Sequence, residues 1–108
     1  MSYSIEVTDN FKKEAKKLIK KYASLKNEIA NLATSLKDNP TQGVALGNNV
    51  YKLRIAIASK NQGKSGGARI ITYIKVENKI VYLLSIYNKG EKETISEIEI
   101  KSLIEKHL

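Results

Sequence analysis

The first third of the chain carries two apolar stripes at helical spacing. The first predicts an amphipathic helix over residues 9–22, capped by Thr8 or Asp9, and consists of Phe11, Ala15, Leu18, Ile19 and Tyr22. The second predicts a helix from Ser24 to about Asp38, ending before Pro40, and consists of Leu25, Ile29, Leu32 and Leu36. Because the link between them is short, we expect a helical hairpin that packs on a sheet.

Strand patterns dominate the remainder of the chain. Alternating or β-branched segments predict strands over residues 3–7, 51–58, 68–76 and 79–87, and the loop 41–50 leaves room for a short strand over 44–46. In 51–58, Leu53 and Ile55 alternate with Lys52 and Arg54, so one face is apolar and the other basic. In 68–76 one face carries Arg69, Ile71, Tyr73 and Lys75.

The last predicted strand follows a tight turn at Glu77-Asn78 and forms a hairpin with the one before it. Simple alternation assigns one face to Ile80, Tyr82, Leu84 and Ile86. It assigns the opposite face to Val81, Leu83, Ser85 and Tyr87.

A C-terminal helix completes the predicted order β-α-α-β-β-β-α. Thr94 and Glu97 have the spacing of a capping box, and the inner face of this helix would carry Ile100, Leu103, Ile104 and His107. The order predicts a single α+β domain over residues 1–108, in which helices cover one side of an antiparallel sheet. The opposite, partly bare face would then carry Arg54, Arg69, Tyr73 and Tyr87.

Charge adds a chemical preference to this fold. The chain has 19 Lys+Arg against 11 Asp+Glu, a net charge of +8, and no acidic residue between Asn39 and Val76. Both arginines, Arg54 and Arg69, fall in that acid-free block, and a guanidinium is well suited to phosphate. Nucleic acid, an acidic protein or an anionic surface would suit this balance. The lysines of the first predicted helix could form a surface that contacts RNA, or they could simply form a solvated face.

Several other classes of function are disfavoured. There is no cysteine and one histidine, His107, so disulfides and a zinc site are not expected. No apolar run is long enough to span a membrane and the start of the chain has no signal-peptide pattern, so we expect a cytoplasmic protein. Gly63-Lys64-Ser65 resembles the end of a P-loop, but Ala58 stands where a glycine is needed and a strand follows, not a helix.

Three segments together resemble the RelE/ParE superfamily of toxins, and most closely its HigB-like branch. They are Arg54, the loop Gly-Lys-Ser-Gly-Gly-Ala-Arg over residues 63–69, and the run Leu-Leu-Ser-Ile-Tyr-Asn-Lys-Gly-Glu-Lys over residues 83–92. The resemblance implies a RelE-like fold and a ribosome-dependent mRNA endonuclease that needs no metal or cofactor. It also implies a cognate antitoxin of helix-turn-helix type, with ribosome and mRNA as the other partners, and no membrane. We expect the free protein to be a monomer.

The resemblance implies two groups of site residues. The catalytic group consists of Arg54, Arg69, Tyr87, Lys89 and Lys92. The RNA-binding group consists of Lys52, Lys60, Lys64, Ser65 and Tyr73. The arginines would neutralise charge on the scissile phosphate, with Lys64 assisting. Tyr87 is a candidate base or stacking platform, Lys89 or Lys92 a candidate acid, and Glu91 either a base or a partner of a lysine.

This chain lacks the active-site histidines of some HigB-like relatives, so a Lys/Arg/Tyr set would have to perform the catalysis. Two alternatives stay open. One is a ParE-like inhibitor of DNA gyrase on the same fold, and the other is a ribosome- or RNA-binding module without chemistry.

Overall fold

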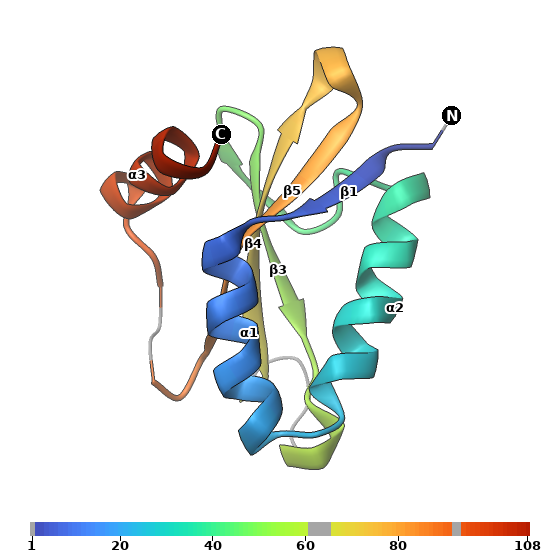
Figure 1. The fold of residues 1–108 in the computed structure, drawn as a ribbon, viewed down its shortest axis with the longest axis vertical. Coiled ribbons are helices and arrows are strands. Elements are labelled where there is room, and N and C mark those ends of the chain that lie inside the picture. Colours follow the sequence, from blue (N-terminus) through green and yellow to red (C-terminus); the bar gives the residue numbers. More distant parts are fainter. Residues whose placement is uncertain (1, 61–65, 92–93) are drawn as a thin grey trace.

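A single five-stranded sheet, in the order β1-β5-β4-β3-β2, forms the centre of the molecule (Figure 1). The computed structural model describes residues 2–60, 66–91 and 94–108. Its strands are β1 (Ser4–Val7), β2 (Val44–Gly47), β3 (Val50–Ile55), β4 (Ala68–Lys75) and β5 (Ile80–Asn88). Its helices are α1 (Asp9–Lys21), α2 (Leu25–Asp38) and α3 (Glu97–His107), with short 3-10 turns at Ala58–Lys60 and Val76–Asn78. The predicted α+β fold is confirmed, including the short strand β2.

The strand directions differ in one place from the prediction of an antiparallel sheet. Neighbouring strands from β2 to β5 are antiparallel, but β1 pairs in parallel with β5, with Ser4 opposite Ile80 and Val7 opposite Leu83. The sheet is therefore mixed. Alternation of apolar residues reports which face a side chain occupies and is the same for both directions, so it could not reveal this pairing.

The helical hairpin packs on one face of the sheet, as predicted. Thr8 caps α1, because its Oγ1 accepts a hydrogen bond from the Phe11 N–H at 3.2 Å. Phe11 and Leu18 are buried in a cluster with residues of all three central strands, among them Ile55, Ile70 and Leu83. The lysines of α1 lie on its exposed side. Apolar burial on one stripe therefore fixes how the hairpin sits on the sheet.

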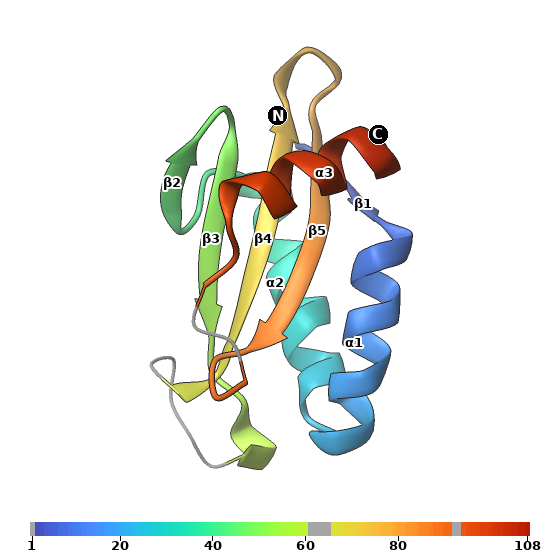
Figure 2. The ribbon, with the colours of Figure 1, turned by 90° about the vertical axis from the view of Figure 1, so that its left-hand side faces the viewer.

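The position of α3 is a correction. Figures 1 and 2 show it crossing the face opposite α1 and α2, so the helices do not all cover one side. Ile95 and Ile100 pack there in a second buried cluster with Ile71 and Leu84. The physical reason is that the central strands carry consecutive apolar residues, such as Ile70-Ile71, which require cover on both faces.

The start of α3 also differs from the prediction. Its N-cap is Ser96, whose Oγ accepts a hydrogen bond from the Glu99 N–H at 3.1 Å. The predicted capping box of Thr94 and Glu97 is therefore wrong by two residues. Ser96 and Glu99 have the same spacing, so the sequence held two candidate caps that local chemistry could not separate.

A β-bulge in β5 overturns the predicted alternation of that strand. Thr72 is opposite Leu83, but Ile71 is opposite Ser85, which leaves Leu84 as an extra residue. Up to Leu83 the alternation holds, whereas beyond the bulge Ile86 joins the cluster under the helical hairpin and Tyr87 joins Leu84 under α3. The predicted grouping of Ile86 with Leu84, and of Tyr87 with Leu83, is wrong for this reason.

Candidate functional site

Two arginines and a tyrosine form a row across three neighbouring strands. Arg54 of β3 is directly opposite Arg69 of β4, and Arg69 is directly opposite Tyr87 of β5. Side chains at directly opposed positions project from the same face, with Cβ atoms about 4.5–5.5 Å apart. The row lies where β3 and β5 end and β4 begins, beyond the part of the sheet that α3 crosses (Figure 2). The bulge brings Tyr87 into this row, because without it Tyr87 would face the helical hairpin.

One member of the row is exposed and the other two are buried. Arg54 is exposed, whereas Arg69 is 4% exposed and Tyr87 6% exposed. Arg69 donates a hydrogen bond from Nη1 to the Ala68 carbonyl oxygen at 3.2 Å. The pKa of Arg69 is lowered from its ordinary value, first by burial and then by the positive charge of Arg54, while Tyr87 acts in the opposite direction. An arginine still keeps its charge at neutral pH, so Arg69 provides a buried positive charge that a hydrogen bond holds in position.

This arrangement places two positively charged side chains directly opposite each other. Like charges directly opposite each other on a sheet destabilise it, and burial of a charged group adds to that cost. An anion between Arg54 and Arg69 would offset both effects, because a guanidinium binds phosphate through paired hydrogen bonds. The two guanidinium groups are thus placed where they could bind a phosphate together.

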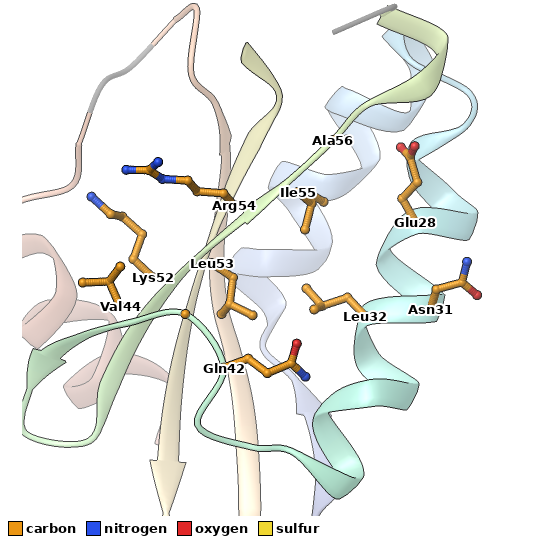
Figure 3. Close-up of a pocket in the computed structure, with 11 residues that line it drawn as sticks. Glu28, Asn31, Leu32, Gln42, Val44, Lys52, Leu53, Arg54, Ile55 and Ala56 are labelled. Atoms are coloured by element: carbon orange, nitrogen blue, oxygen red, sulfur yellow. The ribbon is translucent and has the colours of Figure 1, made fainter. Parts of the chain in front are cut away.

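Two lysines lie near the row. Lys52 is half-buried and two residues from Arg54 along β3, and Figure 3 shows both side chains on the same side of that strand. Lys89 is half-buried and directly follows β5. Its N–H donates to the Gly67 carbonyl oxygen at 3.1 Å, which ties the end of β5 to the start of β4.

Not every residue of the two predicted groups joins this row. Tyr73 is four residues from Arg69 along β4, about 13 Å at the rise of a strand. It stacks on Tyr82, with ring centroids 6.3 Å apart and planes at 28°, beside the cluster under α3. Lys60 lies in the 3-10 turn Ala58–Lys60. Lys64, Ser65 and Lys92 lie outside the described residues.

Two carboxylates near the site are engaged in other contacts. Glu91 lies 3.5 Å from the Nζ atom of Lys21, and both side chains are exposed, so this pair is a weak surface contact. Glu28 accepts hydrogen bonds from the Ala58 N–H at 2.8 Å and from the Ser24 hydroxyl at 3.2 Å. The contact with Lys21 does not decide between the two roles that the sequence left open for Glu91, so both stay predictions.

Sequence reasoning missed the role of Glu14 at the bulge. Its Oε1 accepts hydrogen bonds from Ser85 Oγ at 2.7 Å, Asn10 Nδ2 at 2.9 Å and the Ile86 N–H at 3.3 Å. These contacts hold β5 at the point where its side chains change face, directly before Tyr87. The only indication of this role in the sequence is that Glu14 is an acidic residue placed between lysines on α1.

Among the described residues there is no group of three or more His, Cys, Asp or Glu side chains placed to hold a metal ion. No helix in the same part of the chain combines the length and apolar character needed to cross a membrane.

Comparisons with known proteins are consistent with this fold. A family model described as the RelE toxin of the RelE/RelB toxin-antitoxin system matches residues 3–106. Among solved structures, the chain is similar to a double arginine-to-alanine mutant of the E. coli toxin RelE in the free state, with a TM-score of 0.68 at 15% identity over 100% of both chains. It is also similar to the isolated E. coli RelE toxin, with a TM-score of 0.63 at 15% identity over 97% of this chain and 99% of the other. At this identity the two structures show the fold, and neither they nor the family model single out the HigB-like branch.

Proposed function

The chain belongs to the family of RelE toxins of toxin-antitoxin systems, and from this premise we propose that it is an endoribonuclease that cleaves mRNA on the ribosome. As a toxin of such a system it has an antitoxin as a partner. The observation that carries the proposal is the row of Arg54, Arg69 and Tyr87, because it combines two cations with a proton-carrying group on one face of the sheet.

The proposed reaction uses a nucleophile that the RNA itself supplies. The 2′-hydroxyl oxygen attacks the adjacent phosphorus, a new bond forms between them, and the bond from phosphorus to the 5′-oxygen breaks. One proton leaves the 2′-hydroxyl and one proton reaches the departing 5′-oxygen, so the products are a 2′,3′-cyclic phosphate and a 5′-hydroxyl. This chemistry requires charge neutralisation and two proton carriers, and it requires no metal.

We assign the cationic role to the two arginines. Arg69 is buried and held against the sheet, so its position changes little when negative charge develops on the phosphate. Arg54 is exposed and can approach the phosphate from the edge of the sheet. Lys52 would contact the neighbouring RNA backbone, and Lys60, Lys64, Ser65 and Tyr73 are proposed as further RNA contacts.

Tyr87 is proposed as the base that takes the proton of the 2′-hydroxyl, or as the surface on which a base stacks. Lys89, directly after β5, is proposed as the acid for the 5′-oxygen, with Lys92 as the other candidate. A cation beside a tyrosine favours its ionised form whereas burial opposes it, so the proposed role of Tyr87 as a base relies on the positive charge of Arg69.

The test is cleavage of a defined mRNA in a reconstituted translation system, with and without ribosomes, mapped by primer extension. We expect cleavage only with ribosomes, and Arg69→Gln to reduce its rate by about 100-fold or more. Tyr87→Phe keeps the ring but removes the hydroxyl, so a large loss would support a base and a small one a stacking role. Lys17→Gln, on the exposed side of α1, is the matched control for lost charge.

Cleavage that survives Arg69→Gln together with Tyr87→Phe would overturn this site. Accumulation of gyrase-linked DNA breaks without mRNA cleavage would favour the ParE-like alternative. Ribosome binding without either activity would favour the module without chemistry.

A further inference from the structure

A tight turn directly after β5 carries Lys89, and Asn88 closes this turn in two ways. The Asn88 carbonyl oxygen accepts a hydrogen bond from the Glu91 N–H at 3.0 Å. The Asn88 side chain accepts a second one, from the Gly90 N–H to Oδ1 at 3.1 Å. An asparagine that binds the backbone two residues further on stabilises a turn in this way. Asn88 therefore fixes the path of the backbone on which Lys89 lies.

The side chain of Asn88 also connects this turn to the interior of the molecule. Asn88 is 4% exposed, and its Nδ2 donates a hydrogen bond to the Tyr22 hydroxyl oxygen at 3.4 Å. Tyr22 is the C-cap of α1 and packs against the buried cluster under the helical hairpin. Because successive side chains of a strand point to opposite faces, Asn88 supports the turn from the face opposite Tyr87. The support thus comes from behind the row and leaves the face of the row open.

The turn lies at the end of the sheet that carries the row of Arg54, Arg69 and Tyr87 (Figure 2). The Lys89 N–H donates to the Gly67 carbonyl oxygen at 3.1 Å, so the ladder between β4 and β5 extends to Lys89. Gly67 itself packs so closely on β3 that an added Cβ would collide with the Ile55 carbonyl oxygen. The backbone of Lys89 is therefore held on one side by the sheet and on the other by Asn88.

We propose that Asn88 is a positioning residue for the cleavage reaction and acts through Lys89. Its side chain holds the turn in the conformation from which the Lys89 ammonium group reaches the departing 5′-oxygen, and this role rests on the proposed function. When the bond from phosphorus to the 5′-oxygen breaks, its electron pair stays on the oxygen. Lys89 Nζ gives a proton to that oxygen and becomes a neutral amine, which takes up a proton from water. Proton transfer requires hydrogen-bond reach, and a displacement of about 1 Å can slow a reaction about 100-fold.

A matched pair of variants isolates the contact within the turn. Serine can accept the Gly90 N–H as asparagine does, though more weakly, whereas alanine has no acceptor. Asn88→Ser and Asn88→Ala both lose the contact with Tyr22, so the two variants differ in the turn contact alone. In the protein without RNA, amide hydrogen exchange measured by NMR should be about tenfold faster at Gly90 in Asn88→Ala than in Asn88→Ser.

The cleavage assay compares the natural mRNA with an mRNA in which sulfur replaces the scissile 5′-oxygen. A cysteine thiol has a pKa of about 8.5, so a thiolate can leave without the proton that an alkoxide requires. At saturating toxin, Asn88→Ala should slow single-turnover cleavage of the natural mRNA about tenfold or more and leave the half-saturating toxin concentration unchanged. Cleavage of the sulfur substrate should be unchanged in Asn88→Ala and in Lys89→Gln.

Two further comparisons test whether Asn88 acts through Lys89. Asn88→Ser should cleave the natural mRNA faster than Asn88→Ala. The double variant Asn88→Ala with Lys89→Gln should be no slower than Lys89→Gln alone, because the two residues serve one step.

Equal losses on both substrates would show a merely structural role for Asn88 and overturn the proposal. A double variant slower than Lys89→Gln, or equal Gly90 exchange in the serine and alanine variants, would overturn it as well. A wild type that cleaves neither substrate would overturn the proposed function and this role with it. A wild type that cleaves both substrates, with no loss in Asn88→Ala, would overturn only the role of Asn88.

Discussion

Replacement of Glu14 should destabilise the protein far more than a half-buried surface residue normally would. Glu14 Oε1 accepts three hydrogen bonds, and two of them come from β5, from Ser85 Oγ at 2.7 Å and the Ile86 N–H at 3.3 Å. Ser85 is 1% exposed, so water cannot replace its lost partner. A buried donor left without a partner costs about 1–3 kcal/mol. With two such donors, one of them at a long distance, we expect Glu14→Ala to lower the free energy of unfolding by about 3 kcal/mol.

The assay is urea denaturation followed by circular dichroism, with Lys13→Ala as a control on the exposed side of the same helix. The control should change stability by less than about 0.5 kcal/mol. A double-mutant cycle of Glu14→Ala and Ser85→Ala isolates the contact, and we expect a coupling of about 1 kcal/mol or more. A cost of Glu14→Ala no larger than that of the control, or a coupling near zero, would refute the reasoning that this carboxylate clamps the bulge.

Three further predictions concern buried or strained positions. Thr72 is fully buried and its Oγ1 has no hydrogen-bond partner in the part of the chain that is described, so Thr72→Val should stabilise the protein by about 1 kcal/mol in the same urea assay. Gly43→Ala should cost about 2 kcal/mol more than Gly47→Ala, because both have positive φ but only at Gly43 does the new Cβ collide with backbone; equal losses would contradict this. In Arg69→Lys the ammonium starts from a pKa of about 10.4, and burial and Arg54 would lower it. Cleavage by this variant should therefore fall as the pH rises toward that lowered pKa, while the wild type keeps its charge, and ¹³C NMR titration of the introduced side chain would measure the pKa directly.

The features that could be read from the sequence are those with a local period. The stripes of α1 and α2 repeat at helical spacing, and Leu53, Ile55 and Arg54 alternate without interruption, so their faces were predicted correctly. The bulge at Leu84 has no such signal. Because both faces of the sheet are covered, apolar residues occur on each face, and two of them in succession do not reveal that one residue is extra. The contact at the bulge comes from Glu14 on α1, 71 positions before Ser85, whose hydroxyl donates to the Glu14 carboxylate.

The same distinction applies to the site. Arg54 and Arg69 could be assigned to one face because β3 and β4 keep their register throughout. Tyr87 was expected beside them, although the predicted alternation of β5 contained no bulge to place it there. Tyr73 shares the face of Arg69 as predicted, but α3 covers that part of the sheet and Tyr73 packs with Tyr82 instead. Where a helix docks depends on tertiary packing, which the period of a strand does not encode.

The opposed arginines suggest why the chain has no acidic residue between Asn39 and Val76. A carboxylate within this block could reach Arg54 or Arg69, offset the repulsion between them and occupy the position that a phosphate would take. An anion that binds between the two guanidinium groups relieves their mutual repulsion, and this relief favours the binding of a phosphate. The nearby carboxylate of Glu28 is instead bonded to the Ala58 N–H, on the far side of β3 from the Arg54 side chain.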